Sequence, residues 1–262
     1  MADTPDREDR ILFEHPLNER IRTLLRLEYL FAQGEFGTAG ESEWHSRMAV
    51  NALVDLVSLL SRGDLRSEIQ KELERLVTTL ESLQERPGVD GRRLEPVLNE
   101  CRSVNERLRE APPGIPGFVK DNEFLGAIIQ RSGILGGTCA FDLPGYHLWL
   151  QAPHSERRAH LERWFSGFQI LREGTRLILR LLRDSADPVT EVARGGGYQG
   201  TLDRATPYQM LRVSLPRDAT CFPEISGSKH FCTIRFLEQP EAGERPRQVE
   251  GDVEFILERC VV

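Results

Sequence analysis

Two stretches with matching apolar spacing, separated by one tight turn, constrain the fold of this chain most. Apolar side chains recur every three or four residues within residues 69–83 and again within 94–108. This spacing is typical of helices that pack along a coiled-coil-like seam. The segment between them, RPGVDG at residues 86–91, is rich in turn formers. We therefore predict an antiparallel helical hairpin. Its seam residues are Ile69, Leu73, Leu76, Leu80 and Leu83, then Leu94, Val97, Cys101, Val104 and Leu108.

Helical spacing also marks the segments on either side of this hairpin. Gly63 and Asp64 precede its first helix as a break and a candidate N-cap, and APPGIPG at residues 111–117 ends its second helix. We predict a loop at residues 32–42 because AQGEFGTAGES is rich in glycine and polar residues. The other expected helices begin near Pro16, run from Trp44 to Leu60, from Val119 to Arg131, and as one long helix from Pro153 to Asp184.

The pattern changes to a period of two in the last third of the chain. Apolar and polar residues alternate in residues 211–215, 232–236 and 253–257, which is typical of half-buried antiparallel strands. We predict an α+β fold with a mainly helical domain and a smaller antiparallel β domain. The expected parts are a helical domain at 1–135, with 1–10 disordered and 11–17 a candidate strand, a strand segment of the β domain at 136–152, a helix of the helical domain at 153–186, and the β domain at 187–262.

Composition limits the possible partners. The chain has 262 residues and a net charge of −7, so it is not expected to bind nucleic acid, which requires a basic surface. Its apolar runs are shorter than the ~18 residues of a membrane span, and its first ten residues are charged, so we expect a cytoplasmic protein. Lys71, Lys120 and Lys229 are the only lysines; the arginine bias suits carboxylate capture, although genome base composition explains it equally well.

Cofactor and metal motifs are weak in this sequence. The five cysteines are scattered without a CxxC pair, which disfavours a disulfide framework or a zinc ribbon. GGGYQG at residues 195–200 matches GxGxxG, but no amphipathic helix follows it, so a flexible loop is expected. His230 and Cys232 lack a second ligand pair. We expect no metal, cofactor or catalytic residue.

One catalytic alternative concerns Cys139 and His147 in GGTCAFDLPGYHLWL. A cysteine-dependent hydrolase or transferase requires the two side chains within about 3 Å of each other. Eight residues of extended chain separate them by roughly 25 Å unless Pro144-Gly145 reverses the chain. We instead expect a strand in which Tyr146, Leu148 and Leu150 face the core, while His147 and Trp149 face outward.

Basic side chains close to glycine breaks are the candidate binding residues. On an acidic chain they could form a recess that attracts an acidic or carboxylate-ended segment, although single surface arginines usually contribute little. The candidates are Arg22, Arg26, Arg62, Arg66, His147, Lys229, His230 and Arg235.

Five blocks of the sequence resemble the ZapD family, the bacterial Z-ring-associated protein D. They are LFEHPLNERIRTLLRLEYL (12–30), RGDLRSEIQKELER (62–75), PGVD (87–90), GGTCAFDLPGYHLWL (136–150) and PEISGSKHFCTIRF (223–236). The resemblance implies a non-enzymatic cytoplasmic homodimer at the division septum that binds the tubulin-like GTPase FtsZ through its C-terminal peptide. It further implies that a positively charged surface grips this peptide, bundles FtsZ filaments and reduces GTP turnover.

The resemblance also carries over to single residues. Arg26, Arg62, Arg66, His147 and Arg235 lie within the matching blocks and keep the charge that the binding role needs. Lys229 and His230 lie in a segment one residue shorter than the family pattern, and Asn122-Glu123 carries less positive charge than the pattern leads us to expect.

Overall fold

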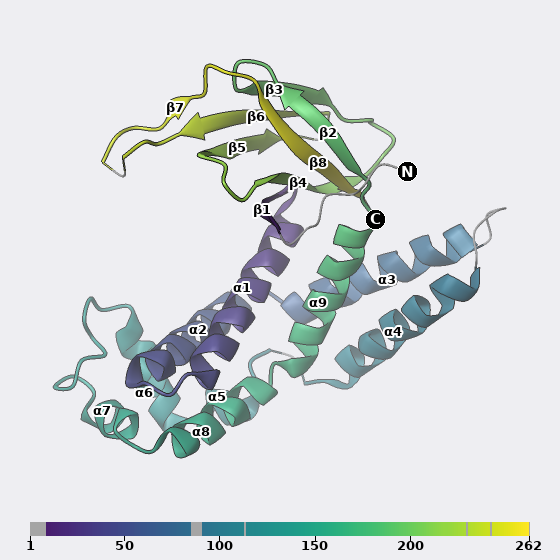
Figure 1. Cartoon of the computed structure of the whole chain (residues 1–262). Coiled ribbons are helices and arrows are strands. Elements are labelled where there is room, and N and C mark those ends of the chain that lie inside the picture. Colours follow the sequence, from purple (N-terminus) through teal and green to yellow (C-terminus); the bar gives the residue numbers. More distant parts are fainter. Residues whose placement is uncertain (1–8, 85–90, 113, 229, 242, 262) are drawn as a thin grey trace. The chain divides into compact units, whose positions relative to one another are not determined.

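The computed structural model describes residues 9–84, 91–112, 114–228, 230–241 and 243–261. The chain divides into two compact units, which we call the β unit (residues 1–23 and 179–262) and the helical unit (residues 24–178). Helices α1 (Glu19–Ala39) and α9 (Gln169–Asp184) carry the chain from one unit to the other (Figure 1). The predicted α+β class is confirmed.

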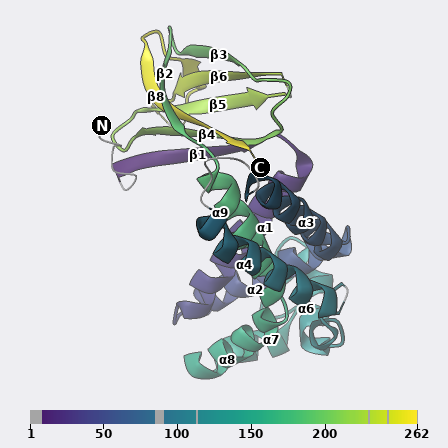
Figure 2. The same ribbon diagram turned by 90° about the vertical axis from the view of Figure 1, so that its right-hand side faces the viewer.

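Two antiparallel sheets form the β unit, and Figure 2 shows their strands. One sheet has the order β1-β4-β8-β2, and the other has the order β3-β6-β5 with β7 paired to β6. The N-terminal strand is paired along its whole length with β4, from Arg10 opposite Pro216 to Pro16 opposite Met210. The strands are β1 (Arg10–Pro16), β2 (Pro188–Ala193), β3 (Gly197–Thr201), β4 (Tyr208–Pro216), β5 (Cys221–Gly227), β6 (Phe231–Glu238), β7 (Arg247–Gln248) and β8 (Val253–Val261).

Apolar side chains from both sheets make the core of the β unit. Val213 and Leu257 from one sheet and Ile234 and Phe236 from the other are fully buried in one cluster. The rings of Phe236 and Phe255 lie with their centroids 5.0 Å apart. The period of two identified the inward-facing residues of β4, β6 and β8, but β4 is not half-buried as predicted, because its polar residues Arg212 and Ser214 are buried as well.

The flexible loop predicted at residues 195–200 is wrong for residues 197–200, which belong to a strand. Gly195 and Gly196 have φ angles of 53° and 71°, and they form a tight turn whose Gly197 N–H donates to Arg194 O at 3.0 Å. Residues with positive φ at both central positions suit a two-residue hairpin, which only glycine and a few other residues form readily. Gly197–Thr201 then forms β3, paired with β6.

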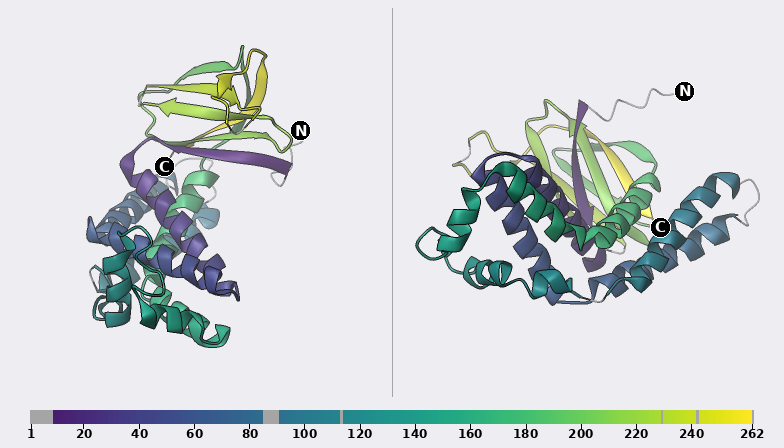
Figure 3. Two further views of the ribbon diagram at one scale, coloured as in Figure 1. Left: turned by 90° about the vertical axis from the view of Figure 1, so that its left-hand side faces the viewer. Right: turned by 90° about the horizontal axis from the view of Figure 1, so that it is seen from below.

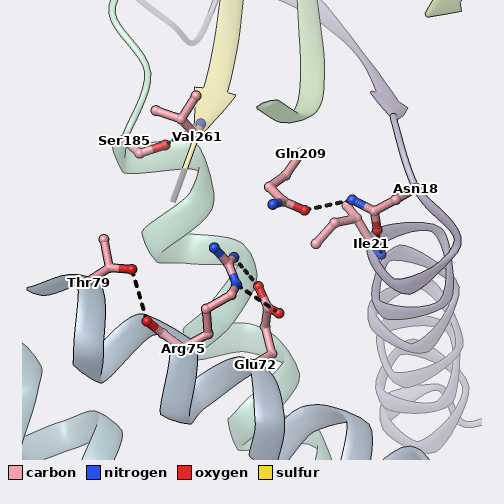
Figure 4. A network of polar contacts seen from close by, with 8 residues as sticks. All are labelled: Asn18, Ile21, Glu72, Arg75, Thr79, Ser185, Gln209 and Val261. Atoms are coloured by element: carbon pink, nitrogen blue, oxygen red, sulfur yellow. Dashed lines mark hydrogen bonds and ion pairs between the residues drawn. The ribbon is translucent and has the colours of Figure 1, made fainter. Parts of the chain in front are cut away.

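Asn18 determines where α1 begins. Its Oδ1 accepts a hydrogen bond from Ile21 N–H at 2.9 Å, and its Nδ2 donates to Gln209 Oε1 at 2.6 Å (Figure 4). The side chain thus caps the helix and fixes its first turn to strand β4. We predicted a start near Pro16, but Pro16 is the last residue of β1.

The predicted helical hairpin is confirmed in the helical unit. Helices α3 (Leu65–Gln84) and α4 (Gly91–Glu110) run side by side in Figure 3, and the predicted turn at residues 85–90 lies outside the described residues. Ion pairs Arg109–Glu74 and Arg102–Glu81 join the helices in antiparallel register. The remaining helices are α2 (Glu43–Ser61), α5 (Gly117–Lys120), α6 (Glu123–Ser132), α7 (Pro144–Leu150) and α8 (His154–Ser166).

Helix α1 continues through most of the predicted loop, which corrects the expectation for residues 32–42. The helix ends only at Ala39. A Cβ on Gly34 would lie 2.5 Å from Phe165 Cζ, so this glycine allows a close approach to the neighbouring side chain. Gly34 is therefore explained by the packing of the helix and does not mark its end.

Two other predicted helices are each interrupted. The segment from Val119 to Arg131 contains α5 and α6, because Asn122 starts α6 as an N-cap that accepts from Leu125 N–H at 3.1 Å. The long helix from Pro153 to Asp184 is two helices, α8 and α9, with Gly167 as the C-cap of α8.

The predicted strand at residues 136–152 is wrong. Pro144–Leu150 forms helix α7, which begins with a proline at its first position and lies in the helical unit. Tyr146 and Leu150, four residues apart, are buried, whereas Leu148 is 74% exposed. A five-residue alternation cannot distinguish a short strand from one and a half helical turns.

Candidate functional site

Arg62 and Arg66 are the predicted binding residues that the structure places at one site. Both line a groove of about 540 Å³ formed by residues 60–66, 111–112, 114, 116–118, 167 and 170–171, all in the helical unit. We call it the Arg62 groove. It lies where the end of α2 and the start of α3 meet the APPGIPG segment. The proline-rich interruption that ended the predicted hairpin therefore forms one of its walls.

The two arginines are held differently. Arg62 is exposed and follows the last residue of α2, and its backbone N–H donates to Leu59 O at 3.3 Å. Arg66 is half-buried in the first turn of α3, where Nη1 donates to the carbonyl oxygen of Ala111. Its Nε is buried without a hydrogen-bond acceptor among the described residues. The site thus pairs one guanidinium that is hydrogen-bonded to the protein with one that is exposed to solvent.

Asp64 is the carboxylate among the described residues of this groove, and its side chain already accepts hydrogen bonds within the protein. It accepts hydrogen bonds from Ser67 Oγ and from Ser67 N–H, the latter at 3.1 Å. The Ser67 hydroxyl, followed by its backbone N–H, lowers the pKa of Asp64. Asp64 therefore caps α3 as an ionised group, as predicted, while Arg62 and Arg66 leave the described groove with a positive balance.

A second groove of the helical unit has balanced charge. It has a volume of about 470 Å³ and lies between α1, α8 and α9. Its arginines face glutamates: Arg158 Nε lies 2.7 Å from Glu162 Oε1, and Arg172 forms an ion pair with Glu35. These pairings leave little net attraction for an anion. The Arg62 groove is the better anion site of the two.

The other predicted residues lie elsewhere. Arg22 is in the β unit, where its Nε lies 3.1 Å from Glu19 Oε2. Arg26 is an exposed residue of α1 in the helical unit. His230 is exposed in the β unit, where Arg235 of β6 forms an ion pair with Glu224 of the neighbouring β5. Lys229 lies outside the described residues. Convergence of these residues with Arg62 and Arg66 stays a prediction.

His147 is exposed, as predicted, although on a helix. Helix α7 packs through aromatic rings. The centroid of the Trp149 ring lies 5.9 Å from that of the stacked Tyr146 ring and 5.7 Å from that of the tilted Trp164 ring. Burial raises the pKa of Tyr146 to about 12. Trp149 is half-buried in this cluster, so the prediction that it faces outward is wrong. His147 is not among the residues that line the Arg62 groove.

The contacts of Cys139 do not form a catalytic dyad. Its Sγ lies 3.4 Å from Asp142 Oδ2, and among the described residues no hydrogen bond joins it to His147. Asp142 is itself paired with Arg131 at 2.9 Å.

In the described part of the chain, no three His, Cys, Asp or Glu side chains are grouped to hold a metal ion. No helix among the described residues is long and apolar enough to span a membrane.

Sequence reasoning missed the apolar wall of the groove. Three large apolar residues line it in addition to the arginines: Phe118, Ile170 and Leu171. Phe118 is 41% exposed although it is a large apolar side chain. Its position just after the APPGIPG segment was the available signal, because helix α5, which follows, has only four residues and can bury few side chains.

Fold and groove together define the class: a two-unit α+β protein whose helical unit carries a cationic groove. Residues 25–235 match the model of the ZapD family, which is described as a cell division protein. The chain belongs to the ZapD family. It is 42% identical over 255 residues to the cell division protein ZapD of Methylococcus capsulatus, covering 97% of this chain and 100% of the relative. It is 38% identical over 251 residues to the ZapD of Cupriavidus pinatubonensis, covering 95% and 99% of the two chains.

Proposed function

We propose that this cell division protein binds FtsZ by taking the C-terminal peptide of FtsZ into the Arg62 groove. The observation that carries the proposal is the pairing of Arg62 and Arg66 in one groove whose carboxylate, Asp64, is occupied by a helix cap. Guanidinium groups bind carboxylates through paired, charge-assisted hydrogen bonds. A groove of this kind suits a short acidic or carboxylate-ended segment and performs no covalent chemistry.

We further propose that the protein acts as a homodimer in the cytoplasm at the division septum. One groove per copy gives a dimer two sites, so that it can hold the tails of two filaments. Binding at the second site is then favoured by the effective concentration that the first contact creates, which compensates for a modest single-site affinity. Bundled filaments with slower GTP turnover are the expected consequence. The proposal includes no cofactor, nucleic acid or membrane.

The remaining basic candidates enter the proposal as a supporting field. Arg22, Arg26, His147, Lys229, His230 and Arg235 are then basic positions that attract an acidic tail to the protein. Because exposed charges act over about 10 Å at ordinary salt, single substitutions among them should have small effects.

Sedimentation of FtsZ filaments tests the proposal. With GTP, wild-type protein should carry FtsZ into the pellet as bundles, and FtsZ without its C-terminal peptide should stay in the supernatant. The charge-reversed variant Arg62→Glu/Arg66→Glu should bundle poorly, as wild type does in high salt. Charge reversal of an exposed arginine in the second groove, Arg158→Glu, is the control for a change of net charge. Equal bundling of intact and truncated FtsZ would remove tail capture from the proposal.

A further inference from the structure

The Arg62 groove has an apolar half that an acidic segment alone does not explain. Phe118, Ile170 and Leu171 line it together with Pro112 and Pro116. Leu171 is buried and Ile170 half-buried, but Phe118 keeps 41% of its surface exposed. Large apolar groups left open beside a charged rim are typical of binding sites.

The Phe118 ring is held in place by its neighbour Gly167. A Cβ on Gly167 would lie 2.6 Å from Phe118 Cζ and 2.8 Å from Pro116 Cγ. The absence of a side chain at Gly167, the C-cap of α8, therefore lets the ring lie directly against the backbone. One side of the ring is packed and the rest remains exposed. The packed side limits the positions open to the ring, which lowers the cost of ordering it when a partner binds.

The two halves of the groove are joined by one hydrogen bond. Arg66 donates Nη1 to the carbonyl oxygen of Ala111, the residue that begins the APPGIPG segment. This contact ties the first turn of α3 to the segment that leads to Phe118. The cationic and apolar halves are therefore positioned relative to each other by the protein itself.

We propose that the Arg62 groove recognises a two-part signal, a carboxylate next to a large apolar side chain, in which Phe118 and Ile170 receive the apolar group. The inference rests on the proposed function, and its occupant is the C-terminal peptide of FtsZ. The carboxylate gives salt-dependent attraction to Arg62 and Arg66. The apolar side chain provides affinity that salt does not screen and discriminates against segments that are only acidic.

A binding titration with a fluorescent synthetic peptide of the FtsZ C-terminus tests this inference on the full-length chain. Phe118→Ala should weaken binding about tenfold and keep the wild-type salt dependence, because a buried aromatic contact is lost while both charges remain. The charge-neutral variant Arg62→Gln/Arg66→Gln should weaken binding and remove most of the salt dependence, because the positive charges that salt screens are then absent. Phe118→Leu should retain much of the affinity.

A second perturbation reaches the ring without changing it. Gly167→Ala should displace Phe118 and weaken binding with an unchanged salt slope, whereas Gly126→Ala, where an added Cβ meets nothing within 4 Å, should bind like wild type. Circular dichroism of each variant checks the fold. A peptide whose large apolar residues are replaced by alanine should bind wild type as weakly as the intact peptide binds Phe118→Ala.

The outcomes separate the inference from the function on which it rests. If the peptide binds wild type and loses affinity only with the arginine variant, while Phe118→Ala and Gly167→Ala bind normally, the apolar half plays no part and the inference is overturned. If the peptide does not bind wild type at all, tail capture itself fails. Loss of affinity in the arginine, Phe118 and Gly167 variants together supports both.

Discussion

Arg157 Nη1 donates a hydrogen bond to Ser46 Oγ at 2.7 Å, and both residues are buried. The same guanidinium donates to three backbone carbonyl oxygens, those of Ala152 at 3.0 Å, Ser42 at 3.2 Å and Glu41 at 2.6 Å. Every described acceptor is a neutral oxygen. One arginine therefore joins the loop after α1, the start of α2 and the loop between α7 and α8.

We predict that Arg157→Leu lowers the free energy of unfolding by about 2 to 4 kcal/mol, because it removes the donor of the buried Ser46 hydroxyl and of three partly buried backbone carbonyl contacts. Urea denaturation of the full chain measures the change. Arg157→Lys should recover part of the loss, since an ammonium group cannot reach all four acceptors. The control is Arg158→Ala, whose exposed partner is Glu162, and it should change the value by less than about 0.5 kcal/mol. A loss as large in Arg158→Ala would contradict this account.

The sequence predicted the parts of the fold whose signal is long and regular. The spacing of Ile69, Leu73 and Leu76 continues for several turns, and the α3–α4 hairpin was predicted from it. Strands β4, β6 and β8 were predicted from an alternation of five residues each, which repeats in three successive segments in the last third of the chain. Periodicity is informative where many positions on one face are buried together.

The errors share a physical cause. At these positions tertiary packing decided the structure, and the local residue types alone indicated a different one. Gly34 indicated a loop, but it is the place where α1 meets Phe165. The alternation of Tyr146, Leu148 and Leu150 indicated a strand, but Pro144 starts helix α7, in which the Tyr146 and Trp149 rings stack. In the candidate site, the charges of Arg62 and Arg66 were evident from the sequence. The apolar wall was not, because Ile170 and Phe118 are far apart in the chain.

Gly34→Ala should destabilise the protein by about 1 to 3 kcal/mol, because the added Cβ would overlap the Phe165 ring. The comparison is Gly126→Ala in α6, where the added Cβ has open space. That change should leave the protein unchanged or stabilise it by about 0.5 to 1 kcal/mol through helix propensity. The difference between their urea midpoints gives the result, and equal midpoints would show that α1 and Phe165 do not pack this closely.

Acid should destabilise the β unit partly through His15. Burial, followed by the nearby Arg22 charge, lowers the pKa of His15 from its ordinary value of 6.5. The folded state therefore favours neutral His15, so this contribution to stability is complete above pH 6.5 and declines as the pH falls toward the lower folded-state pKa. We predict that His15→Gln loses less stability than wild type between pH 7.5 and pH 5.5, judged by thermal unfolding. The same loss in both proteins would assign the acid sensitivity to other groups.

The catalytic alternative makes a prediction of its own, since a nucleophilic thiol and a packing thiol respond differently to substitution. Cys139 is half-buried, its Sγ lies 3.4 Å from Asp142 Oδ2, and the described contacts give it no base to activate it. We expect Cys139→Ser to bundle FtsZ like wild type and a thiolate-selective reagent at neutral pH to label Cys139 slowly. Rapid labelling together with loss of function in Cys139→Ser would revive the cysteine-dependent enzyme.

Arg212 and Glu258 belong to a buried charge cluster in the sheet β1-β4-β8-β2. We predict that substitutions of the two residues have non-additive effects on the free energy of unfolding. Arg212 Nη1 lies 2.9 Å from Glu258 Oε2, and both side chains are at most 6% exposed. Removing one partner leaves a buried charge without compensation, so Arg212→Met should cost about 3 to 5 kcal/mol. Replacing both, as Arg212→Met/Glu258→Leu, should cost clearly less than the sum of the single changes, because neither charge then remains to be desolvated. Arg212 also contacts Glu14 at 3.1 Å, and Glu14 is shared with Arg183 at 2.8 Å, so the double variant should not recover full stability. Additive losses in urea denaturation would mean that water reaches this pair and that the cluster contributes no more than a surface ion pair.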